Sequence, residues 1–249
     1  MKKVLQKTAG LAGRVFEFLR PDRIIGVSYI NALNKREFAH AQFRGFNERS
    51  VEYRFVFEQI AAYYPHTVLD VGPGVTALPS LMHTCGPQVW AIDNIEDYWP
   101  NGMFNRHYHV LNDNIVDPKI QQNFDMITCI STLEHIEDFK GAVASMFRLL
   151  KPGGNLVLTF PYTEKKFVDD VYGLPASNAF KKRPVYKAHS FSRTEIESFA
   201  KENNAEVVSQ EYWQFWTGAE WSTGERLPLP KRVTQNDLHQ HSCVLLAKR

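Results

Sequence analysis

The sequence has few cysteines, little net charge and no long apolar run. Only three cysteines stand among its 249 residues, widely spaced and without a C-x-x-C pair, so neither a disulfide framework nor a zinc site is indicated. The formal net charge of +2 is too small to predict a nucleic-acid-binding surface. No stretch approaches the roughly 20 apolar residues of a membrane-spanning helix. These absences predict a reduced, cytoplasmic protein that has no nucleic acid as a partner.

The composition that remains is that of an ordinary globular protein. Hydrophobic residues make up 44% and charged residues 22% of the chain, which excludes disordered and collagen-like proteins. The length favours one α/β domain with added segments over two full domains.

Two kinds of apolar pattern divide the chain near residue 66. Residues 1–66 repeat apolar side chains at helical spacing. From residue 67 onward, short apolar runs appear at TVLDV, QVWAID, HYHVL, FDMITCI and NLVLTF, with room for a helix or crossover loop between them. This alternation predicts an α/β fold with a doubly wound parallel sheet. We expect an N-terminal helical segment over 1–66, then a domain over 67–249 with an insertion at about 162–190.

Two helices are expected in the second half of the chain. One covers residues 133–150 and stops at LKPGGN, where a proline and two glycines follow a lysine. The other lies in FSRTEIESFAKENN, with Ser192 as its N-cap and Glu195 three residues later. The segments AEVVSQEYW and HSCVLLAKR are the expected last two strands.

The stretch VLDVGPGVTALP, residues 68–79, places a glycine-rich turn directly after a strand. Gly72, Gly74 and Ala77 satisfy the dinucleotide pattern G-x-G-x-x-G/A, so the pattern alone leaves NAD open. Asp70, however, would set a carboxylate beside the doubly negative pyrophosphate. The turn therefore favours a ligand with a positive end and no phosphate, such as S-adenosylmethionine.

Here the sequence resembles the class I S-adenosylmethionine-dependent methyltransferases. Asp70, Gly72 and Gly74 match the D-x-G-x-G motif of that family, although Thr76 stands where many members have a third glycine. FDMITCISTLEHIED and LLKPGGNLVLTFPY match its fourth and fifth strands with their adjoining turns. The likeness is close over about residues 50–160. It implies a Rossmann-like sheet that is mostly parallel, with an antiparallel C-terminal strand.

The resemblance also implies a set of residues that bind the cofactor. Asp93 matches the acidic residue that holds the two ribose hydroxyls, a good use of a carboxylate, and Asp113 matches the residue beside the adenine amino group. Arg49, Tyr53 and Arg54 either meet the carboxylate of the cofactor or form a solvated helix face. The full expected set is Asp70, Gly72, Pro73, Gly74, Asp93, Asn94, Asp113, Asn114 and Ser131.

Methyl transfer to a hydroxyl group is helped by a general base, whereas an amine needs only to arrive unprotonated. The resemblance directs STLEHIED toward the methyl group, with His135 the preferred base over Glu134 because an imidazole titrates near neutral pH. Both side chains have the alternative of capping or packing. His189 is a further candidate base, with a capping or surface role as its alternative. Some relatives hold a metal with E-x-x-E-H here, but Ser131 replaces the first glutamate, so no metal is expected.

The acceptor is less well defined by the sequence. The lysine-rich segment 162–190 suits an anionic acceptor or is a solvated loop, and the aromatic residues of 212–221 suit sugar rings or belong to the core. An amphipathic helix near the N-terminus, with Lys3, Lys7 and Arg14 opposite its apolar face, suits peripheral contact with the inner surface of a membrane or covers a protein surface.

A looser resemblance, to bacterial methyltransferases of surface polysaccharide synthesis, favours a sugar hydroxyl of a glycan or glycolipid as the acceptor. The alternatives are a small-molecule amine or carboxylate, a non-catalytic partner protein that only binds the cofactor, and a nicotinamide oxidoreductase. The intact STLEHIED loop argues against the non-catalytic alternative. The oligomeric state does not follow from the sequence.

Overall fold

The computed structural model describes residues 21–43, 45–99, 101–180 and 186–249, and the chain divides into two compact units, Met1–Gly45 and Phe46–Arg249. The expected amphipathic helix near the N-terminus lies outside the described residues. In the first unit, helix α2 (Pro21–Ala39) is 19 residues long, and its described side chains are mostly exposed. None of the helices in the described ranges is both long and apolar enough to cross a bilayer.

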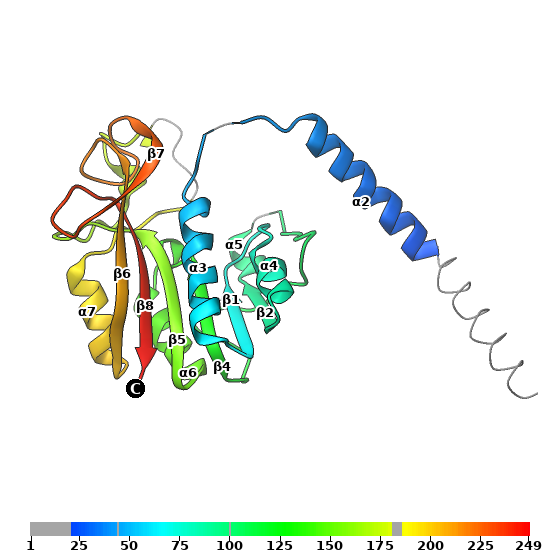
Figure 1. Cartoon of the computed structure of the whole chain (residues 1–249), viewed down its shortest axis with the longest axis horizontal. Helices are drawn as coiled ribbons and strands as arrows, with labels where there is room; N and C mark the ends of the chain where they lie inside the picture. Colours follow the sequence, from blue (N-terminus) through cyan, green and yellow to red (C-terminus); the bar gives the residue numbers. More distant parts are fainter. Residues whose placement is uncertain (1–20, 44, 100, 181–185) are drawn as a thin grey trace, which may run out of the picture. The chain divides into compact units, whose positions relative to one another are not determined.

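The second unit is built on one sheet with the strand order β3-β2-β1-β4-β5-β8-β6-β7 (Figure 1). Strands β1 to β5 pair in parallel, whereas β8 runs antiparallel between β5 and β6, and β7 pairs antiparallel with β6. The predicted Rossmann-like α/β fold is therefore confirmed. The strands are β1 (Thr67–Val71), β2 (Gln88–Asp93), β3 (Leu111–Asn112), β4 (Phe124–Ile130), β5 (Leu150–Pro161), β6 (Ala205–Trp216), β7 (Arg226–Val233) and β8 (His241–Lys248).

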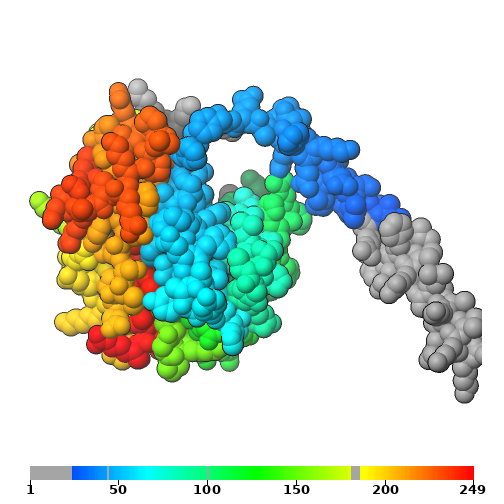
Figure 2. All heavy atoms as spheres, in the orientation of Figure 1, coloured from blue at the N-terminus to red at the C-terminus, as the bar shows by residue number. Residues whose placement is uncertain are grey.

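Helices cover both faces of this sheet, as the alternation of strand side chains requires. On β8, Val244 and Leu246 point into a core that includes α6 and α7, whereas Cys243 and Leu245 point into a core that includes α3 and α4. Figure 2 shows α3 on the surface of the near face of this unit. The helices are α3 (Arg49–Tyr63), α4 (Leu78–Thr84), α5 (Ile95–Tyr98), α6 (Phe139–Leu149) and α7 (Arg193–Glu202), with 3-10 turns η1 (Leu133–His135) and η2 (Val171–Gly173).

Helix α3 belongs to the second unit. The sequence pattern instead predicts it as part of an N-terminal helical segment over 1–66. Val51, Phe55, Val56 and Ile60 of this helix are buried in the core against α4 and the sheet. A division near residue 66 would remove this cover from β1 and β4. The structure instead divides the chain after Gly45.

The helix expected over 133–150 is split into two elements. After β4 the chain forms the short turn η1, and Asp138 then caps α6 by accepting a hydrogen bond from the Gly141 amide at 2.9 Å. The cap starts a new helix and leaves η1 as a separate turn. The segment that links η1 to α6 thus stays outside regular helix, which keeps Glu134 and His135 at the carboxyl edge of the sheet.

Candidate functional site

The sheet reverses its strand order between β1 and β4, which are hydrogen-bonded neighbours. In open α/β sheets, ligands bind outside the carboxyl ends of the strands at such a point. The glycine turn follows β1 and the turn η1 follows β4, so the two turns face one crevice. Thr132 joins them, because its hydroxyl donates to the carbonyl oxygen of Gly72 at 2.9 Å.

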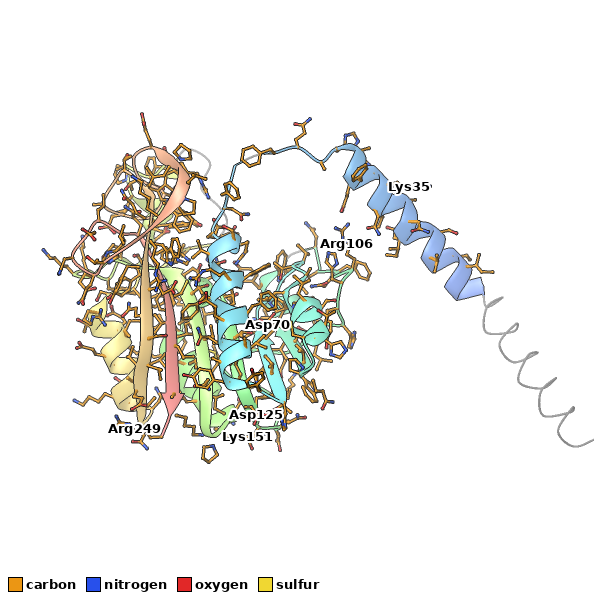
Figure 3. All side chains as sticks on the ribbon, viewed as in Figure 1. Lys35, Asp70, Arg106, Asp125, Lys151 and Arg249 are labelled. Carbon is orange, nitrogen blue, oxygen red and sulfur yellow. The ribbon has the colours of Figure 1, made fainter. Side chains whose placement is uncertain are left out.

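Asp70 lies near the carboxyl end of β1 and is 1% exposed. Its Oδ1 accepts a hydrogen bond from the Thr128 hydroxyl at 2.7 Å, whereas Oδ2 is buried without a partner among the described residues. Burial, with a contribution from Asp93, raises the pKa of Asp70 to about 7. In Figure 3, Asp70 is separate from the ion pair between Asp125 and Lys151 at the opposite edge of the sheet. An unpartnered buried carboxylate oxygen fits a ligand with an ammonium group.

Gly72 and Gly74 both have positive φ angles, +69° and +54°, which favour glycine. A Cβ atom on Gly72 would lie 2.1 Å from Cγ2 of Thr132. The turn after β1 therefore approaches the turn after β4 as closely as the backbone allows. Pro73 lies between the two glycines and lines the same small cavity as Asp70.

Asp93 ends β2, and both of its carboxylate oxygens accept hydrogen bonds. Oδ2 accepts from the Gly74 amide and Oδ1 from the Trp99 indole, each at 2.9 Å, and the Asn94 amide donates as well. Burial raises the pKa of Asp93, against these hydrogen bonds. The Trp99 ring also lies 3.4 Å from the position of a Cβ on Gly74. A ribose at Asp93 would share or replace the Trp99 contact. No sequence motif marks Trp99 as a residue of the site.

Asp113 follows β3 and orders the loop that comes after it. Its carboxylate accepts hydrogen bonds from the backbone amides of Asn114, Lys119 and Ile120 at 2.9 to 3.2 Å. The side-chain oxygen of Asn114 accepts from the amide of Val116. These contacts place both residues at the edge formed by β2 and β3, and their role at the adenine stays a prediction.

Arg49 and Tyr53 of α3 line the cavity that also contains Asp70. The guanidinium of Arg49 contacts Oε2 of Glu52 at 2.8 Å, and its side chain is 32% exposed. Arg54, the third candidate of this group, instead pairs with Glu58 and Glu211. Arg49 is thus the arginine of the set that faces the crevice.

Glu52 is fully buried and connects α3 with the turn after β4 and with strands β5 and β8. Its Oε1 accepts hydrogen bonds from the hydroxyl groups of Ser131 and Thr159 and lies 3.1 Å from Nε2 of His241. Burial favours the neutral acid, but the bond from His241 and the charge of Arg49 outweigh it and lower the pKa of Glu52 to about 2. No sequence pattern predicts this network, because a glutamate within a helix is typical of a surface residue.

Ser131 begins the turn after β4 and has a φ angle of +46°. Its amide donates to both the carbonyl and the hydroxyl oxygen of Thr159 at 3.0 Å, and its own hydroxyl donates to Glu52. The Ser131 side chain is therefore turned toward the buried network. Its expected role in cofactor binding stays a prediction. In that role Ser131 would contact the cofactor with its backbone, or would act indirectly by positioning Glu52.

Glu134 is 4% exposed, and its Oε2 has no hydrogen-bond partner in the part of the chain that is described. Burial raises its pKa to about 8, and the charge of Glu52 adds to the shift. Rings gather beside it: Tyr186 lies 6.0 Å from Tyr98 and 6.4 Å from Tyr172, measured between ring centroids. An uncharged acid with aromatic neighbours thus adjoins the crevice.

His135 is oriented by a backbone carbonyl. Its Nδ1 lies 2.7 Å from the carbonyl oxygen of Lys187, and its ring meets Tyr186 edge-on at 4.7 Å. Because a carbonyl oxygen can only accept, Nδ1 carries the proton and Nε2 the lone pair of the neutral ring. Burial lowers the pKa of His135, which keeps the ring neutral at neutral pH.

His189 is 3% exposed and packs among aromatic rings, with centroids 5.4 Å from Phe139 and 5.5 Å from Phe167. Its Nδ1 lies 2.7 Å from the carbonyl oxygen of Asp169, and its amide donates to the carbonyl oxygen of Glu134 at 2.8 Å. These contacts fit a residue that fixes the turn after β4. A catalytic role for His189 stays a prediction.

Within the described ranges, no group of three or more His, Cys, Asp or Glu side chains is arranged to hold a metal ion. Of the lysine-rich segment, Lys187 pairs with Asp169 at 3.1 Å, and Lys165 and Lys166 are exposed. Residues 181–185 lie outside the described residues. In the aromatic stretch 212–221, Phe215 and Trp221 are buried in the core beside α3, so the stretch is no open platform.

The strand order, the glycine turn and the acidic residues at the ends of β1 and β2 define the class I S-adenosylmethionine-dependent methyltransferase fold. Residues 38–210 match the family described as "Methyltransferase domain". The chain belongs to this methyltransferase family, and S-adenosyl-L-methionine is its cofactor. The unpartnered oxygen of Asp70 and the close turn at Gly72 fit this ligand.

Solved structures share the fold at low sequence identity. A putative methyltransferase from Bacillus halodurans is 14% identical, with a TM-score of 0.56, over 80% of this chain and 98% of that one. The 1,6-didemethyltoxoflavin-N1-methyltransferase of Burkholderia thailandensis, solved with S-adenosylhomocysteine, is 15% identical, with a TM-score of 0.52, over 92% and 90% of the two chains. At these identities the likeness concerns the fold.

Curated relatives match over a shorter stretch. The ubiquinone biosynthesis O-methyltransferase of Xanthomonas oryzae pv. oryzae is 36% identical over 103 residues, which are 37% of this chain and 41% of that protein. The protein of the same name from Pseudomonas fluorescens is 30% identical over 96 residues, 36% of this chain and 41% of the relative. This chain thus spans about two fifths of the length of these relatives.

Proposed function

We propose that this chain transfers a methyl group from S-adenosylmethionine to a hydroxyl group, with a sugar of a glycan or glycolipid as the acceptor. The observation that carries the proposal is His135, whose Nδ1 is held by the carbonyl oxygen of Lys187. That bond leaves the Nε2 lone pair to take the proton of a hydroxyl. The cofactor supplies the methyl group on a sulfonium, so the protein contributes orientation and the base.

Two further observations support a hydroxyl acceptor with a ring. The rings of Tyr98, Tyr172 and Tyr186 stand beside the turn after β4, and aromatic faces suit sugar rings. We assign segment 162–190, which contributes Tyr172 and Tyr186, to the acceptor side of the second unit, Phe46–Arg249. The relatives are named O-methyltransferases. The pathway in their names favours a second candidate, an acceptor of ubiquinone biosynthesis. A small-molecule amine or carboxylate would make the base unnecessary.

On the cofactor side, we propose that Arg49 binds the carboxylate of S-adenosylmethionine. In titration calorimetry, Arg49→Ala is expected to weaken binding by roughly 10- to 100-fold, because a charge-assisted hydrogen bond contributes about 1.5 to 3 kcal/mol. Arg54→Ala, on the same helix but paired with Glu58 and Glu211, serves as the control and should bind like the wild type.

Decarboxylated S-adenosylmethionine separates this role from a loss of folding. It should bind wild type and Arg49→Ala equally, since the contact in question is missing from the ligand. A loss of affinity for both ligands would assign Arg49 to stability. If the folded wild type binds no S-adenosylmethionine at all, the proposed function fails.

For the base, His135→Ala is expected to lower kcat by about 10²- to 10⁴-fold and to leave cofactor affinity unchanged. The measurement is methyl transfer to a panel of nucleotide sugars, oligosaccharides and hydroxylated quinone precursors. His83→Ala is the control, because Nδ1 of His83 also contacts a carbonyl oxygen, that of Pro87, but the side chain lies on the exposed face of α4. Since burial lowers the pKa of His135, kcat at saturating S-adenosylmethionine should stay level through neutral pH and fall only in acid. Full activity of His135→Ala would show that His135 is not the base. Turnover of quinone precursors alone would contradict the sugar as the acceptor.

A further inference from the structure

Glu134 is a buried acid of the site for which no ion pair is found among the described residues. Its Oε2 is buried and has no hydrogen-bond partner within the described ranges. Burial, followed by the charge of Glu52, raises its pKa to about 8, while Arg49 acts in the opposite direction. Glu134 is therefore predominantly protonated at neutral pH when the crevice holds no ligand.

The groups that face Glu134 leave it sensitive to a new positive charge. Among the described residues that face it, the one cation is Arg49, which already contacts Glu52 at 2.8 Å. Burial is the main cause of the raised pKa values of Tyr98, Tyr172 and Cys129, and Glu134 contributes to them. These three side chains are therefore uncharged at neutral pH. The facing titratable and charged side chains are Glu48, Arg49 and Glu52 from α3 and its N-cap, Cys129 from β4, Tyr98 from α5 and Tyr172 from η2.

The position of Glu134 brings it near the methyl donor. It lies two residues after Thr132, which is bonded to the carbonyl oxygen of Gly72 in the turn that holds the cofactor. The surroundings of Glu134 are buried, so little water is present there to screen the charge of a sulfonium bound in this crevice. An opposite charge in such a region favours the ionised carboxylate, and a neutral thioether does not.

We propose that Glu134 ionises when S-adenosylmethionine binds, as the counter-charge of the sulfonium, and regains a proton once the methyl group has left. This inference rests on the proposed function. In the transfer, the acceptor oxygen forms a bond to the methyl carbon, and the carbon–sulfur bond breaks with its electron pair remaining on sulfur. The hydroxyl proton is passed through His135, and one proton ends on Glu134. Charge therefore balances within the site, without a proton released to solvent.

Comparison of S-adenosylmethionine with S-adenosylhomocysteine isolates the sulfonium. Both ligands carry the same ammonium and carboxylate groups, so contacts with Asp70 and Arg49 are common to the two. The ammonium groups of the free ligands titrate differently, but that difference is identical in every variant of the protein. The difference between wild type and Glu134→Gln in the number of protons released therefore reports the ionisation of Glu134.

The experiment is calorimetry of both ligands at pH 7 in two buffers of different ionisation enthalpy, which counts the protons exchanged on binding. Wild type should release close to one proton more, about 0.9, with S-adenosylmethionine than with S-adenosylhomocysteine, beyond the difference seen in Glu134→Gln. Glu220→Gln is the matched control, because Oε2 of Glu220 is also buried without a partner among the described residues and its pKa is also raised by burial. This control should keep the wild-type difference.

Equal proton release in wild type and Glu134→Gln would overturn the inference while leaving the proposed function intact. Absence of binding by either ligand would instead overturn the proposed function. If Glu134→Gln does not fold, wild type alone decides. Its preference for S-adenosylmethionine over S-adenosylhomocysteine, corrected for the titration of the free ligands, should increase with rising pH, by up to about tenfold per pH unit, until the pH reaches about 8. A preference that is constant with pH would contradict the inference.

Discussion

Glu52→Gln is expected to lower the free energy of unfolding by about 3 kcal/mol at neutral pH, because removing the charge of a buried pair leaves its partners uncompensated. The carboxylate accepts from Ser131 and Thr159 and contacts Arg49 and His241. Glutamine keeps the shape but turns an NH₂ group toward the Arg49 guanidinium. Urea or guanidinium unfolding at pH 7 measures the change.

The control on the same helix is Glu58→Gln. Glu58 pairs with Arg54 at 2.6 Å, but its side chain is 52% exposed, and exposed pairs contribute about 0 to 1 kcal/mol. Equal losses in Glu52→Gln and Glu58→Gln would show that the buried network carries no special stability.

The effect of Glu52 should depend on pH in a defined direction. Its pKa in the folded protein is about 2, lowered from 4.5, so the stabilisation is complete above the unfolded pKa and is lost as pH falls toward the folded one. The difference in unfolding free energy between wild type and Glu52→Gln should therefore be constant near neutral pH and shrink between about pH 4.5 and 2. A difference that does not change over this range would refute the assigned charge.

Gly72→Ala is expected to weaken S-adenosylmethionine binding by about 100-fold or more, since it displaces groups at the crevice by more than the roughly 1 Å that such sites tolerate. The new Cβ would lie 2.1 Å from Cγ2 of Thr132, in a backbone with a φ angle of +69°. To relieve the contact, the turn after β1 and the turn after β4 must move apart, which moves Asp70 and Glu134 as well. Calorimetry of the folded variant measures the affinity.

Gly153→Ala separates backbone strain from this contact. Gly153 has nearly the same φ angle, +74°, but nothing lies within 4 Å of the position of its Cβ. The variant should lose about 1 to 3 kcal/mol of stability through strain and keep its cofactor affinity. Comparable binding by both alanine variants would mean that the close approach of Gly72 to Thr132 is unimportant for the cofactor.

The fold and the cofactor turn could be predicted because their signals are local. Strands β1, β2 and β4 are the runs TVLDV, QVWAID and FDMITCI, and parallel strands buried on both faces read as short apolar runs. The capping box at Ser192 and Glu195 was also predicted and is confirmed. Strand β7 was missed, because two prolines and three basic residues in RLPLPKRV weaken the strand signal.

Local sequence specifies the sheet, the glycine turn and the acidic strand ends, because each depends on residues close together in the chain. Which side chains meet depends on how the elements pack. Glu52 and His241 are 189 residues apart and share one hydrogen bond, and Thr159 reaches Glu52 from 107 residues away. The tertiary structure also decided which acids stay uncharged: both Glu52 and Glu134 are buried, but side chains donate hydrogen bonds to Glu52, whereas among the described residues Glu134 accepts only from a backbone amide. Burial and partners are properties of packing, which no spacing of residues in a sequence specifies.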